Sequence, residues 1–315
     1  MKIKKEYERW LANAVADTDV AAELKAMDYV EVEDAFYRDL AFGTGGLRGV
    51  IGAGTNRMNI YTVAKASQGL ADYLKKHFKE PSVAIGYDSR IKSDVFAKVA
   101  AGVFAANGVS VNILMPVPTV SFATRYLHTS AGVMVTASHN PGKYNGYKVY
   151  GADGCQITTE AAAEILAEIE KLDIFADVKT SNFEAGVANG SIRYIPDEVY
   201  TAFVEQVKSQ SVLFGENVNK NVAIVYSPLN GTGLKPVTRT LQEMGVTLTL
   251  RWSRSRSSQT DIFRPVLTRI LRSRKQWHWA WSMPGSATLT CCWQLTRIVT
   301  VWVLLSRIRL GSMSC

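Results

Sequence analysis

The 315-residue sequence lacks long apolar runs and an apolar leader. Residues 2–14 are charged and helical in pattern, without the apolar core of a secretory signal peptide. The best candidate for a membrane span, residues 286–305, is partly polar and contains Arg297. We therefore expect a cytoplasmic protein with no membrane partner. The fraction of charged residues is not high: 20% of the residues are charged and 47% are hydrophobic. This composition argues against global disorder.

Acidic residues are scarce in one segment only. Between residues 251 and 315, Asp261 is the single acid beside eleven lysines and arginines. Six of the seven tryptophans and three of the four cysteines lie in the same segment. The formal net charge of +8 therefore comes from this tail and not from the body of the protein. The charge of the body gives no indication of a nucleic-acid partner.

Strand and helix patterns alternate through the middle of the chain. This alternation predicts an α/β domain in which helices sandwich a mixed, largely parallel sheet. A helical pattern over residues 2–25, broken at 17–19, and a further short helix over 31–40 precede it. The predicted strands are 83–87, 109–115, 132–135 and 147–150, and the predicted helices are 59–78, 93–106, 119–127, 159–172 and 196–212.

These patterns divide the chain into four predicted segments. Residues 1–40 are predicted to be a helical extension and residues 41–214 the α/β domain. Residues 215–250 begin with a linker and start a second, incomplete α/β domain, with a strand at 222–226 and a helix at 234–244. Residues 251–315 form the arginine- and tryptophan-rich tail.

The string TASHNP at residues 136–141 is the most informative motif of the chain. It follows a predicted buried strand, and open α/β sheets bind ligands at the carboxyl ends of their strands. The oxygen of Ser138 can accept a phosphoryl group. Lys148 follows ten residues later, and a turn at Asn145-Gly146 would bring it back to the serine as a proton acceptor or donor. The alternative for the Ser-His pair alone is a loop serine without a catalytic role.

Two weaker motifs precede the serine string. The glycine-rich loop at residues 42–49 ends in a cation, Arg48, at the place where a dinucleotide fingerprint has its third glycine. It is a phosphate cradle or a flexible turn. The string GYDSR at 86–90 follows a predicted strand, and its Asp88 and Arg90 could form a surface ion pair of little energetic weight.

The three motifs, in this order, resemble those of the phosphohexomutases, the α-D-phosphohexomutase superfamily. The resemblance covers about residues 2–247 and is strongest to bacterial phosphoglucomutases of the phosphopentomutase-related branch. It implies an isomerase that interconverts glucose 1-phosphate and glucose 6-phosphate by intramolecular phosphoryl transfer, with glucose 1,6-bisphosphate as intermediate and activator. The partner is then a phosphosugar; phosphomannomutase or phosphopentomutase specificity stays open, as does the oligomeric state.

The resemblance also implies roles for individual residues. Ser138 would be the phosphoserine and would contact Mg2+ through its phosphate, Lys148 would be the general acid and base, and Arg48 would lie near the transferring phosphoryl group. His139 would be a nearby active-site residue. Substrate and phosphate binding would involve Thr44, Gly45, Arg48, Ser138, His139, Asn140 and Lys148.

The family pattern stops before its metal loop. No Asp-x-Asp-x-Asp-Arg string occurs in the chain. A permitted coding of residues 294–306, regrouped one base earlier, spells ATDPDCDRVGIAV, which contains such a loop. This agreement predicts that the tail is translated out of frame after a one-base loss near residues 247–250. Such a segment is not expected to fold natively, and the first strand of the second domain would then lack neighbouring strands. The chain is accordingly expected to have little or no mutase activity.

Two functions of other classes compete with this interpretation. The tail could make the protein a nucleic-acid binder, if its arginines formed a structured basic face. A serine hydrolase could use Ser138 and His139, but adjacent residues on a strand-end loop are expected to point apart. The sequence around Ser138 also lacks the Gly-x-Ser-x-Gly nucleophile elbow.

Overall fold

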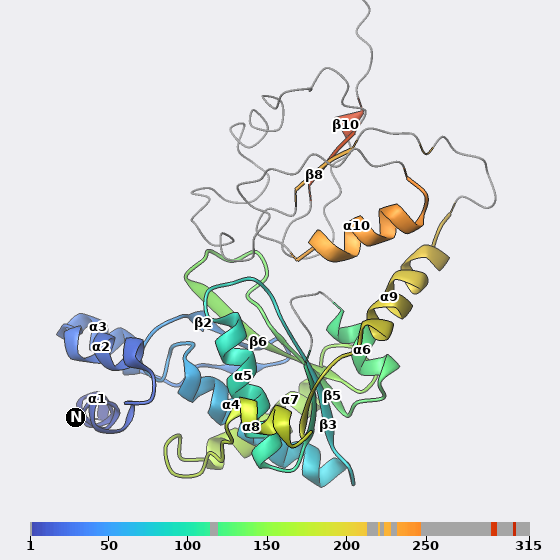
Figure 1. Ribbon diagram of the computed structural model, residues 1–315. Helices are drawn as coiled ribbons and strands as arrows, with labels where there is room; N and C mark the ends of the chain where they lie inside the picture. The colour runs from blue at the N-terminus through green and yellow to red at the C-terminus, as the bar shows by residue number, and fades with distance from the viewer. Residues whose placement is uncertain are drawn as a thin grey trace, which may run out of the picture. The chain divides into compact units, whose positions relative to one another are not determined.

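The computed structural model describes residues 2–113, 119–212, 220, 224–227, 232–246, 291–294 and 305–306 (Figure 1). The chain divides into two compact units, Met1–Val199 and Tyr200–Cys315. Within the described residues, no helix combines the length and the apolarity needed to cross a bilayer. The candidate span at 286–305 lies outside these residues, apart from 291–294 and residue 305.

Three short helices form the N-terminal extension: α1 (Lys2–Asn13), α2 (Thr18–Ala26) and α3 (Tyr29–Phe36). The predicted break at 17–19 is confirmed, because the Asp17 side chain caps α2 by accepting hydrogen bonds from two backbone N–H groups. Asp28 and Glu31 form a capping box at the start of α3, which places that helix two residues earlier than predicted.

Trp10 anchors the extension to the rest of the first unit. Its ring is fully buried and packs edge-to-face against Phe36, Tyr61 and Phe175, with centroid distances of 5.4–5.7 Å. Arg9 adds an ion pair to Asp173, in the segment after α7 (Thr159–Lys171). The extension thus has its own small core, separate from the core of the sheet.

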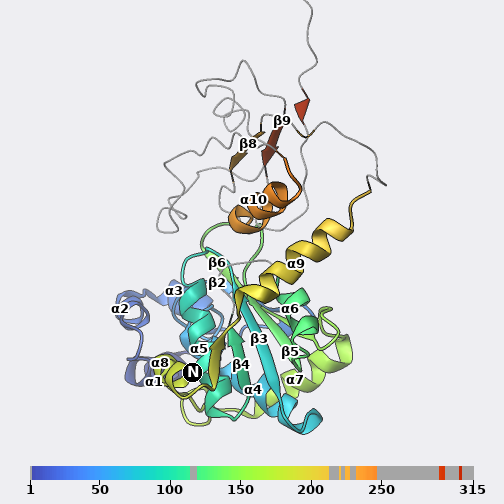
Figure 2. The same cartoon turned by 45° about the vertical axis from the view of Figure 1, so that its right-hand side comes forward.

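A seven-stranded sheet in the order β1-β2-β6-β5-β3-β4-β7 forms the centre of the first unit (Figure 2). The pairs β3–β4, β3–β5 and β4–β7 are parallel, whereas β1–β2, β2–β6 and β5–β6 are antiparallel. The predicted mixed, largely parallel α/β sheet is therefore confirmed. The strands are β1 (Phe42–Gly43), β2 (Gly46–Val50), β3 (Ser82–Tyr87), β4 (Ser110–Ile113), β5 (Ala131–Val135), β6 (Tyr144–Gly151) and β7 (Ile192–Tyr194).

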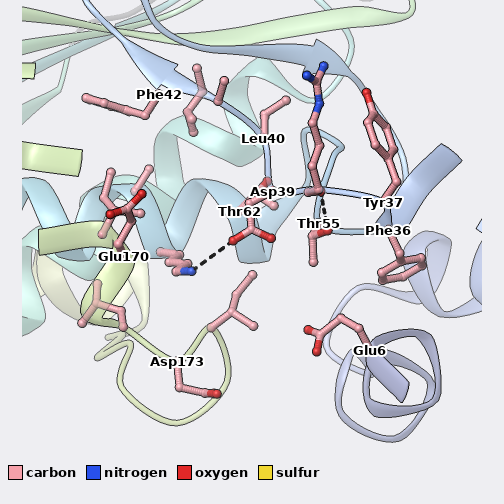
Figure 3. Close-up of a pocket in the computed structure, with 18 of the residues that line it drawn as sticks. Glu6, Phe36, Tyr37, Asp39, Leu40, Phe42, Thr55, Thr62, Glu170 and Asp173 are labelled. Carbon is pink, nitrogen blue, oxygen red and sulfur yellow. Dashed lines mark hydrogen bonds and ion pairs between the residues drawn. The ribbon is translucent and has the colours of Figure 1, made fainter. Parts of the chain in front are cut away.

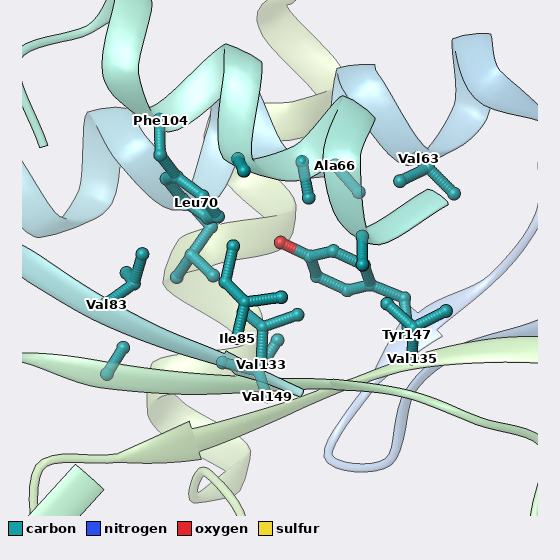
Figure 4. Close-up of a cluster of buried hydrophobic side chains, with 14 of the residues drawn as sticks. Val63, Ala66, Leu70, Val83, Ile85, Phe104, Val133, Val135, Tyr147 and Val149 are labelled. Carbon is teal, nitrogen blue, oxygen red and sulfur yellow. The ribbon is translucent and has the colours of Figure 1, made fainter. Parts of the chain in front are cut away.

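Helices cover both faces of this sheet. On one face α4 (Ile60–His77), α5 (Ser93–Ala106) and α7 bury the main core against the strands, with α8 (Phe183–Ala188) at the side of α5. Figure 4 shows this core, in which Leu70 and Phe104 of the helices meet Val83, Ile85 and Tyr147 of the sheet. On the other face α6 (Val120–Tyr126) packs on Ala84 and Met134.

One local prediction within the first unit is wrong. The glycine-rich stretch is not a loop throughout: it forms the hairpin β1–β2, and Arg48 lies within strand β2. The structure also contains a helix that the predicted elements do not include, α8, which Asn182 caps by accepting from the N–H of Ala185.

The second unit contains helices α9 (Asp197–Ser209), which begins in the first unit, and α10 (Leu234–Glu243). Its three-stranded sheet has the order β10-β9-β8, formed by β8 (Ile224–Ser227), β9 (Cys291–Gln294) and β10 (Leu305–Ser306). The expectation that the first strand of this domain lacks a neighbour is wrong, because β8 pairs in parallel with β9. Ladder hydrogen bonds join main-chain groups, which a segment of any sequence carries. The rest of the tail lies outside the described residues, so its proposed non-native state stays a prediction.

Candidate active site

The serine motif occupies the loop between β5 and β6, at the carboxyl end of β5. Ser138 is buried, with 1% of its surface exposed, and has a left-handed backbone with φ of 59°. Its N–H donates to the hydroxyl oxygen of Thr136 at 2.9 Å. The N–H of Asn140 donates to the carbonyl of Ala137 at 3.1 Å and closes the turn. The chain thus presents the serine in one fixed backbone conformation.

The turn predicted at Asn145-Gly146 is not present, because both residues lie within β6. The turn comes earlier, where the N–H of Tyr144 donates to the carbonyl of Pro141 at 3.0 Å. Gly146 is needed for a different reason: a Cβ atom there would lie 2.7 Å from the carbonyl oxygen of Thr136 and 2.9 Å from that of Leu47. The Asn145 amide donates to the carbonyl of Ile91 and to the hydroxyl of Ser93, each at 3.0 Å.

Ser138 and His139 do not point apart, contrary to expectation. The Oγ atom of Ser138 lies 2.9 Å from Nδ1 of His139, within hydrogen-bond distance. The left-handed φ of the serine turns the two neighbouring side chains toward each other. The imidazole of His139 is exposed, whereas the hydroxyl that it contacts is buried.

The buried side chain of Arg90 holds the serine loop in place through hydrogen bonds to its backbone. Its guanidinium is fully buried and donates to the carbonyl oxygens of Ser138 (3.0 Å), Pro141 (3.1 Å) and Tyr144 (2.6 Å), and also to that of Asn140. One side chain therefore satisfies three loop carbonyls and the carbonyl of Tyr144, the first residue of β6.

Asp88 balances the charge of this arginine. Its carboxylate lies 3.5 Å from Nε of Arg90 and accepts hydrogen bonds from the hydroxyls of Thr136 and Ser93, each at 2.7 Å. Asp88 is 3% exposed, so the predicted surface ion pair is instead a buried pair that links β3, the serine loop and α5.

The two predicted cations lie on one face of the sheet. Arg48 of β2 is opposite Gly146 of β6, and Lys148 follows two residues along the same strand. Since side chains alternate between faces, Arg48 and Lys148 point to the same side, with no side chain at Gly146 between them. Leu47 and Tyr147 point to the opposite side, into the core.

Burial lowers the pKa of the half-buried Lys148, and the positive charge of Arg48 lowers it further, while Asp88 acts in the opposite direction. A lysine with a lowered pKa exchanges a proton more readily near neutral pH than an ordinary surface lysine does.

Three further residues were predicted to bind substrate or phosphate: Thr44, Gly45 and Asn140. Thr44 and Gly45 form the exposed turn of the β1–β2 hairpin. In the described part of the chain, neither makes a hydrogen bond to the serine loop. Asn140 belongs to that loop, and its backbone is held by Arg90.

The described residues do not by themselves fit a Mg2+ site. Among them, no group of three or more His, Cys, Asp or Glu side chains could hold a metal ion. The carboxylate of Asp88 is already engaged by Thr136, Ser93 and Arg90. Phosphorylated Ser138 would offer a phosphate oxygen, a ligand that Mg2+ accepts, but Mg2+ also requires further oxygen ligands.

The sequence interpretation missed the supporting network of Asp88, Arg90, Ser93 and Asn145. A signal was present in the string GYDSR. A carboxylate and a guanidinium at the carboxyl end of a strand parallel to the serine strand lie at the same edge of the sheet as the serine. Their burial could not be read from residue type, because most arginines and aspartates are exposed.

Comparison with known proteins agrees with this geometry. Residues 39–174 match the family described as phosphoglucomutase/phosphomannomutase, alpha/beta/alpha domain I. The chain is 35% identical over 219 residues to a phosphoglucomutase of Staphylococcus haemolyticus, which covers 67% of this chain and 38% of that protein. It is 35% identical over 238 residues to a phosphoglucomutase of Staphylococcus saprophyticus, which covers 75% of this chain and 42% of that protein. The chain thus spans about two fifths of the length of these curated relatives.

Solved structures show the same fold. A putative phosphomannomutase from Thermus thermophilus superposes with a TM-score of 0.64 at 25% identity, over 82% of this chain and 55% of that one. The phosphoglucomutase parafusin from Paramecium superposes with a TM-score of 0.56 at 15% identity, over 86% of this chain and 54% of that one.

Proposed function

The chain belongs to the phosphohexomutase superfamily, whose domain I it carries at residues 39–174, and on this premise we propose that it supplies the phosphoryl-accepting serine of a phosphoglucomutase. The complete enzyme interconverts glucose 1-phosphate and glucose 6-phosphate through glucose 1,6-bisphosphate. The proposal depends on one observation: a buried, rigidly held Ser138 lies at the sheet edge where Arg48 and Lys148 share a face.

Each residue has a part in the proposed transfer. In the first half, a free hydroxyl of the sugar monophosphate attacks the phosphate carried by Ser138: a bond forms between phosphorus and the sugar oxygen, the bond between phosphorus and the Ser138 Oγ breaks, and the bisphosphate results. Lys148 takes the proton from the attacking hydroxyl and gives it to the Oγ of Ser138. Arg48 stabilises the negative charge on the transferring phosphoryl group. The second half of the reaction reverses these steps at the other sugar hydroxyl.

We propose that the 315-residue chain does not complete this reaction alone. In the complete enzyme, Mg2+ bound to the phosphoserine and to carboxylates would neutralise developing charge. The sequence contains no Asp-x-Asp-x-Asp-Arg string to provide those carboxylates. Out-of-frame translation of residues 251–315 is the proposed cause, and resequencing the gene across the codons for residues 247–251 tests it. An unaltered reading frame there would refute the frame proposal.

The functional test compares two proteins: the 315-residue chain and the product of the gene with one base restored. We expect interconversion of the two glucose phosphates by the restored protein and background rates from the chain. Ser138→Ala should abolish the restored activity, whereas Ser181→Ala, on the α5 side of the domain, should leave it unchanged. Normal turnover by the 315-residue chain would refute its proposed inactivity, and activity in the Ser138→Ala protein would refute the role of the serine. The substrate preference is measured by assaying the restored protein with mannose and ribose phosphates as well and comparing the rates with those for the glucose phosphates.

A serine hydrolase is the second candidate, favoured by the 2.9 Å contact between Ser138 and His139. Among the described residues, however, no carboxylate is hydrogen-bonded to His139 to orient it as in a triad. A fluorophosphonate probe separates the two candidates. Labelling of Ser138 that His139→Ala abolishes would support the hydrolase, and absence of labelling would support the mutase.

A further inference from the structure

A cavity of about 560 Å³ lies between the N-terminal extension and the α/β domain (Figure 3). It is on the other face of β2 from Arg48, because Leu47 lines it and neighbouring strand residues point to opposite faces. Its volume falls within the range of 300–1,000 Å³ that is typical of small-molecule sites. The cavity is therefore separate from the proposed catalytic face.

Much of the cavity wall is apolar. Figure 3 shows Leu40 and Phe42 along one side, with Glu170 and Asp173 across from them. The carbon-rich lining continues onto α7. The apolar lining residues are Ile3, Phe36, Leu40, Ala41, Phe42, Leu47, Ala66, Leu166, Ile169, Leu172 and Ile174.

Four cations line the cavity, and two of them are already engaged. Arg9 is paired with Asp173 and lies 3.6 Å from Glu6. The guanidinium of Arg38 stacks over the ring of Tyr37 at 4.9 Å from its centroid. Lys2, at the start of α1, is exposed. These three groups give the cavity no concentrated positive charge.

Lys65 differs from these cations. Its side chain is only 16% exposed, and in the described part of the chain its single ion-pair partner is Asp39, at 3.7 Å. That distance exceeds a hydrogen bond, and the Asp39 side chain is 74% exposed. No described residue accepts a hydrogen bond from the Lys65 ammonium, although an ammonium group has three donors. The ammonium group therefore has donors left for an anionic group in the cavity.

We propose that this cavity binds a small amphipathic carboxylate. Its anionic group pairs with Lys65, and its apolar body lies against Leu40, Phe42 and the α7 residues Leu166 and Ile169. Such a ligand would bridge the helical extension and the domain. The proposal does not depend on phosphoryl transfer at Ser138.

Isothermal titration calorimetry of the full chain with octanoate tests this site. We expect saturable 1:1 binding of octanoate and at least tenfold weaker binding of octan-1-ol, which lacks the charge. Lys65→Gln should weaken octanoate binding at least tenfold. Lys75→Gln is the matched control, because Lys75 lies on the same helix with 43% of its side chain exposed and should leave binding unchanged. Asp39→Asn should strengthen binding severalfold, since it removes the group that competes for Lys65.

Asp39→Asn also guards against misfolding, because an exposed side chain is replaced by one of similar shape. Circular dichroism establishes that each variant is folded. Absence of octanoate binding to the full chain overturns the proposal. Equal affinities for octanoate and octan-1-ol, or equal effects of Lys65→Gln and Lys75→Gln, also overturn it.

Discussion

At the scale of single residues, the environment of Lys148 is the feature most directly open to measurement. Burial and Arg48 both lower its pKa, so Arg48→Gln should raise the pKa of Lys148 toward its ordinary value. Asp88→Asn should lower it, because the opposing negative charge is removed. NMR titration of labelled lysine side chains measures both shifts. Arg57→Gln is the control, and a Lys148 pKa that does not respond to Arg48→Gln would contradict the assignment.

The same lowered pKa has a consequence for stability. Between the pKa of folded Lys148 and its ordinary value, the unfolded chain binds more protons than the folded chain. The contribution of Lys148 to stability therefore increases as pH rises through this window. Arg48→Gln should narrow the window and reduce the increase, which urea unfolding at several alkaline pH values can detect.

Gly146 shows how little space the sheet leaves beside the serine loop. A methyl group there would meet two carbonyl oxygens at 2.7 and 2.9 Å, so Gly146→Ala should destabilise the fold by about 1–3 kcal/mol. Gly43→Ala, in the neighbouring hairpin, is the control, because a Cβ atom there meets nothing within 4 Å. Urea unfolding measures the difference. Equal stability of the two variants would show that β6 can shift to accommodate the methyl group.

At the scale of elements, Arg90 joins β3 to the loop between β5 and β6. Arg90→Gln removes the partner of buried Asp88 and several carbonyl hydrogen bonds, so the unfolding free energy should fall by about 3–5 kcal/mol. Lys98→Gln, which breaks an exposed pair with Glu184, should cost about 0–1 kcal/mol. Hydrogen exchange should also speed up at the loop amides. A loop that stays protected in Arg90→Gln would contradict the clamping role.

The elements themselves were largely predictable from local signals. α5 has the predicted bounds, and α4 begins and ends within one residue of its predicted bounds. The errors lie where distant segments meet. Asn145-Gly146 has the composition of a turn, but Asn145 binds Ile91 and Ser93 while Gly146 fits between two strands. Such contacts depend on tertiary structure, which overrides local preference.

The placement of the site was predictable in part. The sequence placed Ser138 after a buried strand, as observed, and the resemblance singled out Lys148 and Arg48, which the structure brings to one face of the sheet; their roles in phosphoryl transfer stay predictions. The contact between Ser138 and His139 was not predictable, because it requires a positive φ at a residue other than glycine. The cavity at Lys65 was also not predictable, since it forms between segments separated by more than a hundred residues.

At the scale of the whole molecule, the composition of residues 251–315 predicts an aggregation hazard. If the segment is translated out of frame, as proposed, its tryptophans and leucines are not selected for burial and would promote association. Removing residues 251–315 should therefore raise the soluble yield severalfold and lower light scattering at equal concentration. Removal of residues 1–36 is the contrasting deletion and should lower the yield, because it uncovers Ala53, Tyr61 and Phe175, which pack against the core of the extension. If the chain without residues 251–315 aggregates as much as the full chain, then this segment is not the cause of aggregation.

The left-handed backbone of Ser138 has a consequence for how this position would change under different selection. A residue other than glycine in this conformation costs about 1–2 kcal/mol, and glycine would relieve that cost. A library selected only for resistance to heat should therefore favour glycine at residue 138, whereas one selected for turnover should keep serine. At residue 138, thermal stability therefore favours glycine, whereas catalytic activity requires serine.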